Sequence, residues 1–291
     1  MLITTAELQT HLGQAGWVIF DCRHDLMAPA RGAQWYAESH LPGAHFAAVD
    51  GVLSGPLTGR NGRHPLPKPE DFAAFLVRHG VGPASQVVAY DDAGGQYAAR
   101  FWWMARWLGL RNVRVLDGGW PKWLTEGRPT TRETPTPKPT ASWPVRPDAT
   151  QCLTASEVLT ALRHGSITVV DARTPERYRG KTEPIDPVAG RIPTARNRPY
   201  GLNLAADKSF RPAAELRREF EAVLGTVAPD AVVHQCGSGI TACANLFAME
   251  LAGLTGSRLY AGSWSEWIAD PARPVVRGQP SADEARLLGA G

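Results

Sequence analysis

The strongest constraint on the fold is an internal repeat that relates the two halves of the chain. Four short blocks of the first half recur in the same order in the second half, with an offset of 150 positions for the first block and 144 for the last. A solenoid would need a much shorter period, so the sequence predicts a duplicated domain. The paired blocks are Val18–Arg23 with Thr168–Arg173, His40–Ala44 with Arg191–Ala195, Val87–Asp91 with Val232–Cys236, and Gly118–Trp123 with Gly262–Trp267.

Chain length and a proline-rich segment place the domain boundary. The 291 residues suit two domains, because a domain commonly has roughly 100–200 residues. Six prolines occur between Gly127 and Asp148, and such a segment disfavours both helix and central strand. We expect a first domain at 1–127, a linker at 128–150 and a second domain at 151–291.

Composition excludes several classes of protein. The chain is 43% hydrophobic and 20% charged, as is ordinary for a globular protein. A net charge of +3 gives no basis for a nucleic-acid or polybasic membrane partner. No apolar stretch reaches the ~18 residues of a membrane span, and the N-terminus does not resemble a signal peptide. We therefore expect a soluble, cytoplasmic protein.

Apolar, β-branched segments alternate with helical patterns in both halves. This alternation predicts the α/β class, with two tandem domains that each contain a mainly parallel sheet with helices on both faces. Thr154 lies where an N-cap is expected. The predicted strands are 17–21, 87–90, 113–116, 167–171, 231–235 and 258–260, and the predicted helices are 70–79, 96–108, 155–163, 213–224 and 242–251.

The loop after strand 231–235 is the candidate reaction centre. It reads Cys236-Gly237-Ser238-Gly239-Ile240-Thr241 and leads into an apolar helix. Its glycines allow a tight turn whose backbone amides form an anion-binding cup, and the helix N-terminus adds partial positive charge. We expect Cys236 to exist largely as a thiolate there. The alternative is a buried structural cysteine followed by a turn.

The other three cysteines lack this context. Cys22 ends a strand without a glycine-rich loop, Cys243 lies within the following helix, and Cys152 lies near the linker. Four cysteines without a CxxC pair predict reduced thiols and no metal site. The position that matches Cys236 in the first half is Asp91, which cannot carry a sulfur atom. The first domain is therefore expected to lack a reaction centre of its own.

Taken together, these motifs resemble the tandem-domain sulfurtransferases of the rhodanese and 3-mercaptopyruvate sulfurtransferase family. The resemblance covers about residues 3–275 and implies two rhodanese-like domains, the second of them catalytic and the first without the cysteine. It also implies that the cysteine takes sulfur from a donor as a persulfide and passes it on, with no cofactor. The motifs are His40–Ala44, Tyr90-Asp91, Val115–Trp120, Arg177–Gly180 with Glu183-Pro184, and Cys236–Thr241.

The resemblance also bears on the small anionic sulfur donor. Members that prefer thiosulfate tend to have Arg-Lys where this chain has Gly237-Ser238, and a loop without formal charge better suits the single carboxylate of 3-mercaptopyruvate. Thiosulfate remains the alternative donor. The resemblance implies Arg177 as the carboxylate ligand, a role that its planar fork suits. The residues expected to bind substrate are Arg177, Gly237, Gly239, Ile240, Thr241 and Arg191.

A second arginine is expected just after the Glu-Pro pair, but Ile185-Asp186-Pro187 stands there. The missing cation is left open among Arg179, Arg191 and Arg198. Relatives further imply a catalytic Ser–His–Asp relay, which would be Ser238, His64 and Asp50 in this chain. His64 and Asp50 belong to the first half, so a first-domain loop would reach the second-domain cysteine.

Two rival functions are considered. Cysteine phosphatases use a Cys-x5-Arg loop, but position 242 is alanine, so phosphatase chemistry is not expected. The second rival is a non-catalytic module that binds partners or carries persulfide to them; loss of the cysteine would favour it, but Cys236 is present in an intact loop. The acceptor is left open among thioredoxin, a small thiol and cyanide. We expect a monomer, since the two domains can pack on each other.

Overall fold

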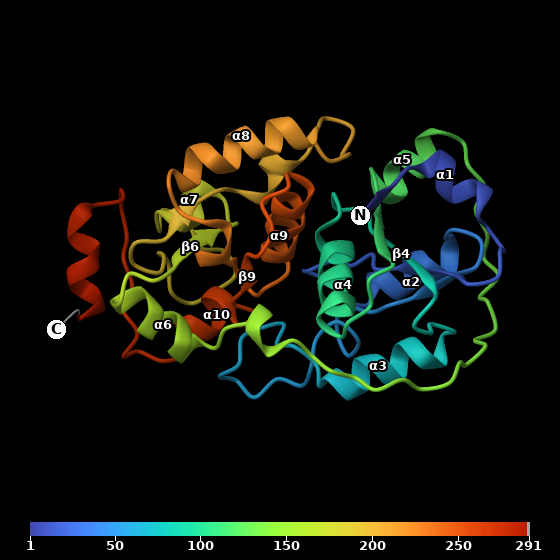
Figure 1. The fold of residues 1–291 in the computed structure, drawn as a ribbon, viewed down its shortest axis with the longest axis horizontal. Coiled ribbons are helices and arrows are strands. Elements are labelled where there is room, and N and C mark those ends of the chain that lie inside the picture. The colour runs from blue at the N-terminus through green and yellow to red at the C-terminus, as the bar shows by residue number, and fades with distance from the viewer. Residues whose placement is uncertain (290–291) are drawn as a thin grey trace. The chain divides into compact units, whose positions relative to one another are not determined.

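The computed structural model describes residues 1–289, and the chain divides into two compact units. The first unit contains 1–56, 66–148 and Leu204–Phe210. The second contains Leu57–Pro65, Ala149–Asn203 and the chain from Arg211 onward. Each half of the sequence therefore supplies one short segment to the unit formed mainly by the other half. Figure 1 follows this path by colour.

A five-stranded, fully parallel sheet forms the centre of the first unit, in the order β1-β5-β4-β2-β3. In the central pair, Trp17 aligns with Gln86 and Asp21 with Tyr90. Apolar side chains of the central strands are buried because helices cover them. The strands are β1 (Leu2–Ile3), β2 (Trp17–Asp21), β3 (Ala44–Phe46), β4 (Gln86–Tyr90) and β5 (Val113–Leu116).

Five helices surround this sheet. The most buried is α4, which packs on β4 and β5 and buries ten of its twelve residues (Figure 1). Most of its buried side chains are apolar, as burial on several sides requires, and the buried Arg100 donates to the Leu53 carbonyl oxygen. The helices are α1 (Thr5–Thr10), α2 (Arg31–Glu38), α3 (Pro69–Arg78), α4 (Gln96–Trp107) and α5 (Gly119–Thr125).

The second unit contains a four-stranded parallel sheet in the order β7-β6-β8-β9. Its strands are β6 (Thr168–Asp171), β7 (Arg196–Asn197), β8 (Val232–Gln235) and β9 (Arg258–Leu259). The helices are α6 (Ala155–Arg163), α7 (Pro175–Tyr178), α8 (Ala213–Leu224), α9 (Thr241–Leu251) and α10 (Ser263–Trp267). Among the described residues, this unit also contains four 3₁₀ helices: η1 (Ala149–Gln151), η2 (Tyr200–Asn203), η3 (Pro229–Ala231) and η4 (Ala282–Leu288).

The predicted fold class is confirmed, and the predicted strands and helices lie within one residue of the observed ends. Thr154 caps α6 as expected: its hydroxyl accepts the N–H of Glu157, whose carboxylate accepts the N–H of Thr154 in return. The short elements were not predicted, including β1, β3, β7, α1, α2, α5, α7 and α10. They span two to eight residues, too few for a periodic pattern to emerge.

The repeat has a matching structural unit in each half. Arg23 binds Asp21 through its Nε and Nη2, and Arg173 binds Asp171 in the same way, with an Nη2–Oδ2 distance of 2.7 Å in both pairs. Both arginines are almost completely buried. Each guanidinium also lies over a tryptophan ring from the last of the four repeat blocks. Arg23 lies 4.3 Å from the ring centre of Trp120, and Arg173 lies 4.6 Å from that of Trp264. The repeated residues therefore hold the strand ends in place.

Candidate active site

Cys236 lies where β8 ends, in the loop that leads into α9. Its side chain is buried, at 2% exposure. The N–H of Gly239 points at the sulfur, with an N–Sγ distance of 3.1 Å. The Cys236 N–H donates to Ser263 Oγ, and the N–H of Trp264 donates to the Cys236 carbonyl oxygen. The start of α10 therefore fixes the backbone of the cysteine, and the loop directs an amide at its sulfur.

Gly239 is required for this turn. Its φ of +84° is in the left-handed region, which favours glycine. A β-carbon at this position would also lie less than 3.0 Å from the Ala261 carbonyl oxygen, which is closer than β-carbons are found in real structures. The next residues, Ile240 and Thr241, form the N-terminus of α9, which adds partial positive charge below the sulfur. The local geometry of this loop suits an anion.

The equivalent loop of the first unit holds an anion of its own. Asp91 is completely buried, and its two carboxylate oxygens accept four backbone N–H groups at 2.8–2.9 Å. The donors belong to Ala93, Gly95, Tyr97 and Ala98. Burial raises the pKa of Asp91 and the backbone donors oppose this effect. The first unit thus places a carboxylate where the second places a thiol.

Ser238 and His64 lie together although the chain separates them by 174 positions. Ser238 Oγ and His64 Nδ1 are 2.7 Å apart, within hydrogen-bond distance, and both side chains are buried. Segment 57–65, which carries His64, belongs to the second unit. Asp50 belongs to the first unit, where its backbone bridges to Ser54 and its side chain is exposed. Its part in a relay stays a prediction.

Arg177 lies in the last turn of α7, close to the Cys236 loop. A β-carbon on Gly237 would lie 3.4 Å from Nη2 and 3.5 Å from Nη1 of Arg177. The Nε and Nη2 groups of Arg177 bind Glu183 at 2.6–3.0 Å, and Nη2 also reaches Asp186 at 3.1 Å. Glu183 therefore fixes the fork, while the Nη1 group forms no hydrogen bond with the described residues. An anion near Gly237 would meet that free donor.

Arg63, which sequence reasoning missed, also lies beside Gly237. The same β-carbon would be 2.8 Å from its Nη2. Arg63 binds Asp186 through Nε at 2.9 Å and Nη2 at 3.2 Å. Its position directly before His64 was the available signal, since a loop that brings the imidazole to Ser238 brings its neighbours too.

Arg191 does not fit the expected role of donor ligand. It is completely buried, forms an ion pair with Glu284, and donates to the carbonyl oxygens of Gly278 and Gln279. It also lies 4.7 Å over the ring of Tyr178. The burial and pairing of Arg191 give no support to a role in donor binding, because its guanidinium is already engaged by the C-terminal segment.

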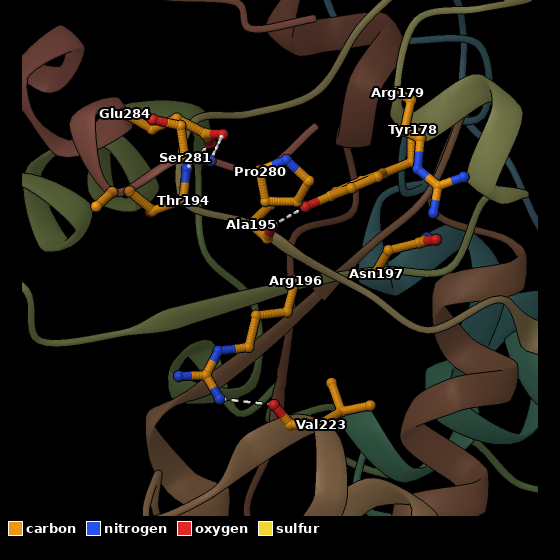
Figure 2. Close-up of a pocket in the computed structure, with 11 residues that line it drawn as sticks. Tyr178, Arg179, Thr194, Ala195, Arg196, Asn197, Val223, Pro280, Ser281 and Glu284 are labelled. Carbon is orange, nitrogen blue, oxygen red and sulfur yellow. Dashed lines mark hydrogen bonds between the residues drawn. The ribbon is translucent and has the colours of Figure 1, made fainter. Parts of the chain in front are cut away.

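The other two candidate cations are also placed elsewhere. Arg198 is 1% exposed, contacts Asn203 and Glu219, and burial lowers its pKa to about 10. Arg179 lines a separate cavity of about 660 Å³ in the second unit. Figure 2 shows this cavity, where the Tyr178 hydroxyl donates to the Ala195 carbonyl oxygen.

Within 1–289, no three His, Cys, Asp or Glu side chains are grouped so that they could hold a metal ion. None of the helices in that range is both long and apolar enough to cross a membrane.

Comparison with known proteins agrees with this architecture. The rhodanese-like domain family model matches residues 4–126 and 154–270. A protein of Pseudomonas aeruginosa named "Probable 3-mercaptopyruvate sulfurtransferase" is 44% identical over 95% of this chain and 98% of its own length. The "Thiosulfate sulfurtransferase" of Bos taurus is 34% identical over 84% of this chain and 83% of its own.

A solved structure has the same fold. The 3-mercaptopyruvate sulfurtransferase from Leishmania major superposes with a TM-score of 0.82 at 30% identity, covering 92% of this chain and 74% of its own. Two matched domains, full-length relatives and a shared fold agree with one another. The chain belongs to the rhodanese family, as a tandem-domain sulfurtransferase.

Proposed function

We propose that this enzyme moves a sulfane sulfur from 3-mercaptopyruvate to a thiol or cyanide acceptor through a persulfide on Cys236. The observation that carries the proposal is the Ser238–His64 pair, whose Oγ and Nδ1 atoms are 2.7 Å apart, with Ser238 in the cysteine loop itself. Proton transfer is needed for 3-mercaptopyruvate, whose carbon must regain a proton once sulfur leaves. Thiosulfate releases sulfite and needs no proton on carbon.

In the first half-reaction, the Cys236 thiolate attacks the sulfur of 3-mercaptopyruvate. An S–S bond forms, the C–S bond breaks, and its electron pair remains on carbon as the enolate of pyruvate. The Gly239 N–H, 3.1 Å from the cysteine sulfur, stabilises negative charge there. The thiol proton of 3-mercaptopyruvate passes to the Ser238–His64 pair, which delivers it to the enolate carbon to give pyruvate, and Asp50 is proposed to orient the imidazole.

In the second half-reaction, an acceptor thiolate or cyanide attacks the outer sulfur of the persulfide. The S–S bond breaks and its electron pair returns to Cys236 as thiolate. The loop amides of Gly237, Gly239, Ile240 and Thr241 are proposed to support the sulfur anions, and Arg177 to bind the donor carboxylate. Acceptors of the right chemistry include thioredoxin, a small thiol and cyanide.

The two repeats are proposed to have different roles. We assign catalysis to the repeat at 151–291 and a non-catalytic role to the repeat at 1–127, with 128–150 as linker. The buried Asp91 in place of a cysteine supports this assignment. A thiolate nucleophile suits the reducing cytoplasm, which is the proposed location, and a monomer is the proposed state.

The test is kcat/KM for 3-mercaptopyruvate and for thiosulfate on the same preparation, with Cys236→Ser alongside. The wild type is expected to prefer 3-mercaptopyruvate and to gain the mass of one sulfur atom when the acceptor is withheld. Cys236→Ser should lose both properties. Remaining turnover in that variant would refute the mechanism, and a preference for thiosulfate would select the alternative donor.

A further inference from the structure

We propose that Asp186 determines which sulfur donor the Cys236 loop accepts. Asp186 holds Arg63 beside Arg177 and cancels part of their combined charge. The inference rests on the proposed function, because it assigns donor choice at that same site. It gives a role to Asp186, which occupies the position after the Glu-Pro pair where the family resemblance implies a second arginine.

One carboxylate joins the two arginines. Asp186 Oδ1 accepts from Arg63 Nε at 2.9 Å, and Oδ2 accepts from Arg63 Nη2 at 3.2 Å. The same Oδ2 accepts from Arg177 Nη2 at 3.1 Å. The Asp186 side chain is 3% exposed, so water screens this charge weakly. Asp186 therefore fixes the spacing of two guanidiniums.

The backbone also holds Arg63 in place. Its N–H donates to Ser265 Oγ at 3.0 Å, and the N–H of Ser265 donates to the Gly237 carbonyl oxygen at 3.0 Å. Arg63 is thus linked through Ser265 to the residue that follows Cys236. The next residue, His64, contacts Ser238. A single dipeptide supplies both a cation and the partner of the catalytic hydroxyl.

Both guanidiniums come close to the Cys236 loop at one point. A β-carbon on Gly237 would lie 2.8 Å from Arg63 Nη2 and 3.4 Å from Arg177 Nη2. The guanidinium groups of Arg63 and Arg177 therefore occupy the space that a side chain at position 237 would need. The Nη1 groups of Arg63 and Arg177 form no hydrogen bond with the described residues. Each can therefore donate a hydrogen bond to an oxygen atom of the sulfur-donor substrate.

The charges near this point balance. Arg63 and Arg177 are positive, and Glu183 and Asp186, which bind them, are negative. A site with free N–H donors but little net charge suits a monocarboxylate. Thiosulfate carries two negative charges, so a nearby carboxylate repels it about twice as strongly as it repels 3-mercaptopyruvate. Asp186 should therefore select against the dianion.

Asp186→Asn tests this selection, because it keeps the shape and removes one negative charge. The kcat/KM for thiosulfate relative to 3-mercaptopyruvate is expected to rise about tenfold, which corresponds to ~1.4 kcal/mol. Asp283→Asn is the matched control, since Asp283 is 75% exposed and its removal changes net charge equally. An unchanged or lower donor ratio in Asp186→Asn would overturn the inference.

Arg63→Gln gives an independent test that does not require Asp186→Asn to fold. It removes one positive charge, so the thiosulfate ratio should fall, opposite in direction to Asp186→Asn. A ratio that rises or stays constant would also overturn the inference. If wild type and Cys236→Ser behave as the sulfurtransferase proposal expects while both ratios stay constant, only this inference fails. If Cys236→Ser keeps its turnover, the proposed function itself fails.

Discussion

The shape of the Cys236 loop can be tested at Gly239, where the backbone and a neighbouring carbonyl both limit the side chain. In Gly239→Ala, a φ of +84° costs about 1–2 kcal/mol for an L-residue. The new methyl group would also collide with the Ala261 carbonyl oxygen. Overpacking of this kind typically adds about 1–3 kcal/mol. The free energy of unfolding should fall by the sum of these two costs.

The sulfur-transfer activity of Gly239→Ala should fall as well. Relief of the collision moves the loop, and the Gly239 N–H no longer points at the Cys236 sulfur. A displacement of about 1 Å at a reacting group can cost roughly 100-fold in rate, so kcat/KM for sulfur transfer should fall by about that factor.

Gly253→Ala is the matched control. Gly253 has a φ of +72° in the same unit, and a β-carbon there meets nothing within 4 Å. It should lose about 1–2 kcal/mol of stability and keep its kcat/KM. Chemical denaturation and steady-state sulfur transfer measure the two quantities in both variants. Equal kcat/KM in both would refute the argument that the tight turn positions the sulfur.

Three further substitutions examine other parts of the molecule. Ser238→Ala should lower kcat for 3-mercaptopyruvate far more than for thiosulfate, and equal losses in steady-state assays would remove the relay. Arg191→Ala should cost about 3–5 kcal/mol in denaturant unfolding, because it leaves Glu284 buried without its partner, and a selective rise in KM instead would restore its role as donor ligand. Burial lowers the pKa of His234 to about 3, so only the unfolded state binds this proton between that value and about pH 6.5. The free energy of unfolding should therefore fall as pH drops through this window, by up to ~1.4 kcal/mol per pH unit, and His234→Gln should flatten the profile if the reasoning holds.

Short sequence patterns were sufficient to predict those strands, loops and helices whose signals lie within the element itself. The strand that ends at Gln235, the loop with two glycines and the apolar helix α9 all lie within twenty positions, and each carries its own signal. The loop around Cys236 was therefore identified from sequence. The fold class followed from the alternation of strand and helix, which does not depend on exact boundaries.

Long-range pairings could not be read from the sequence. Arg63 and Asp186 are 123 positions apart, and neither sequence position indicates that a carboxylate would join two arginines. The pairing of Arg191 was unreadable for a related reason: its partner Glu284 lies in a segment with no match in the repeat. A charged side chain looks the same in sequence whether it faces a substrate or a buried partner.

The buried Asp91 has a consequence for how such a loop can be reused. Its carboxylate accepts four backbone amides in the first unit, so this loop folds around a charge that the chain itself supplies. The equivalent loop of the second unit surrounds the Cys236 thiol instead, and the proposed reaction adds one sulfur atom to it and removes one sulfur atom from it in each cycle. The residue at the end of the strand thus distinguishes a loop with a fixed internal carboxylate from a loop whose central group would change during each catalytic cycle.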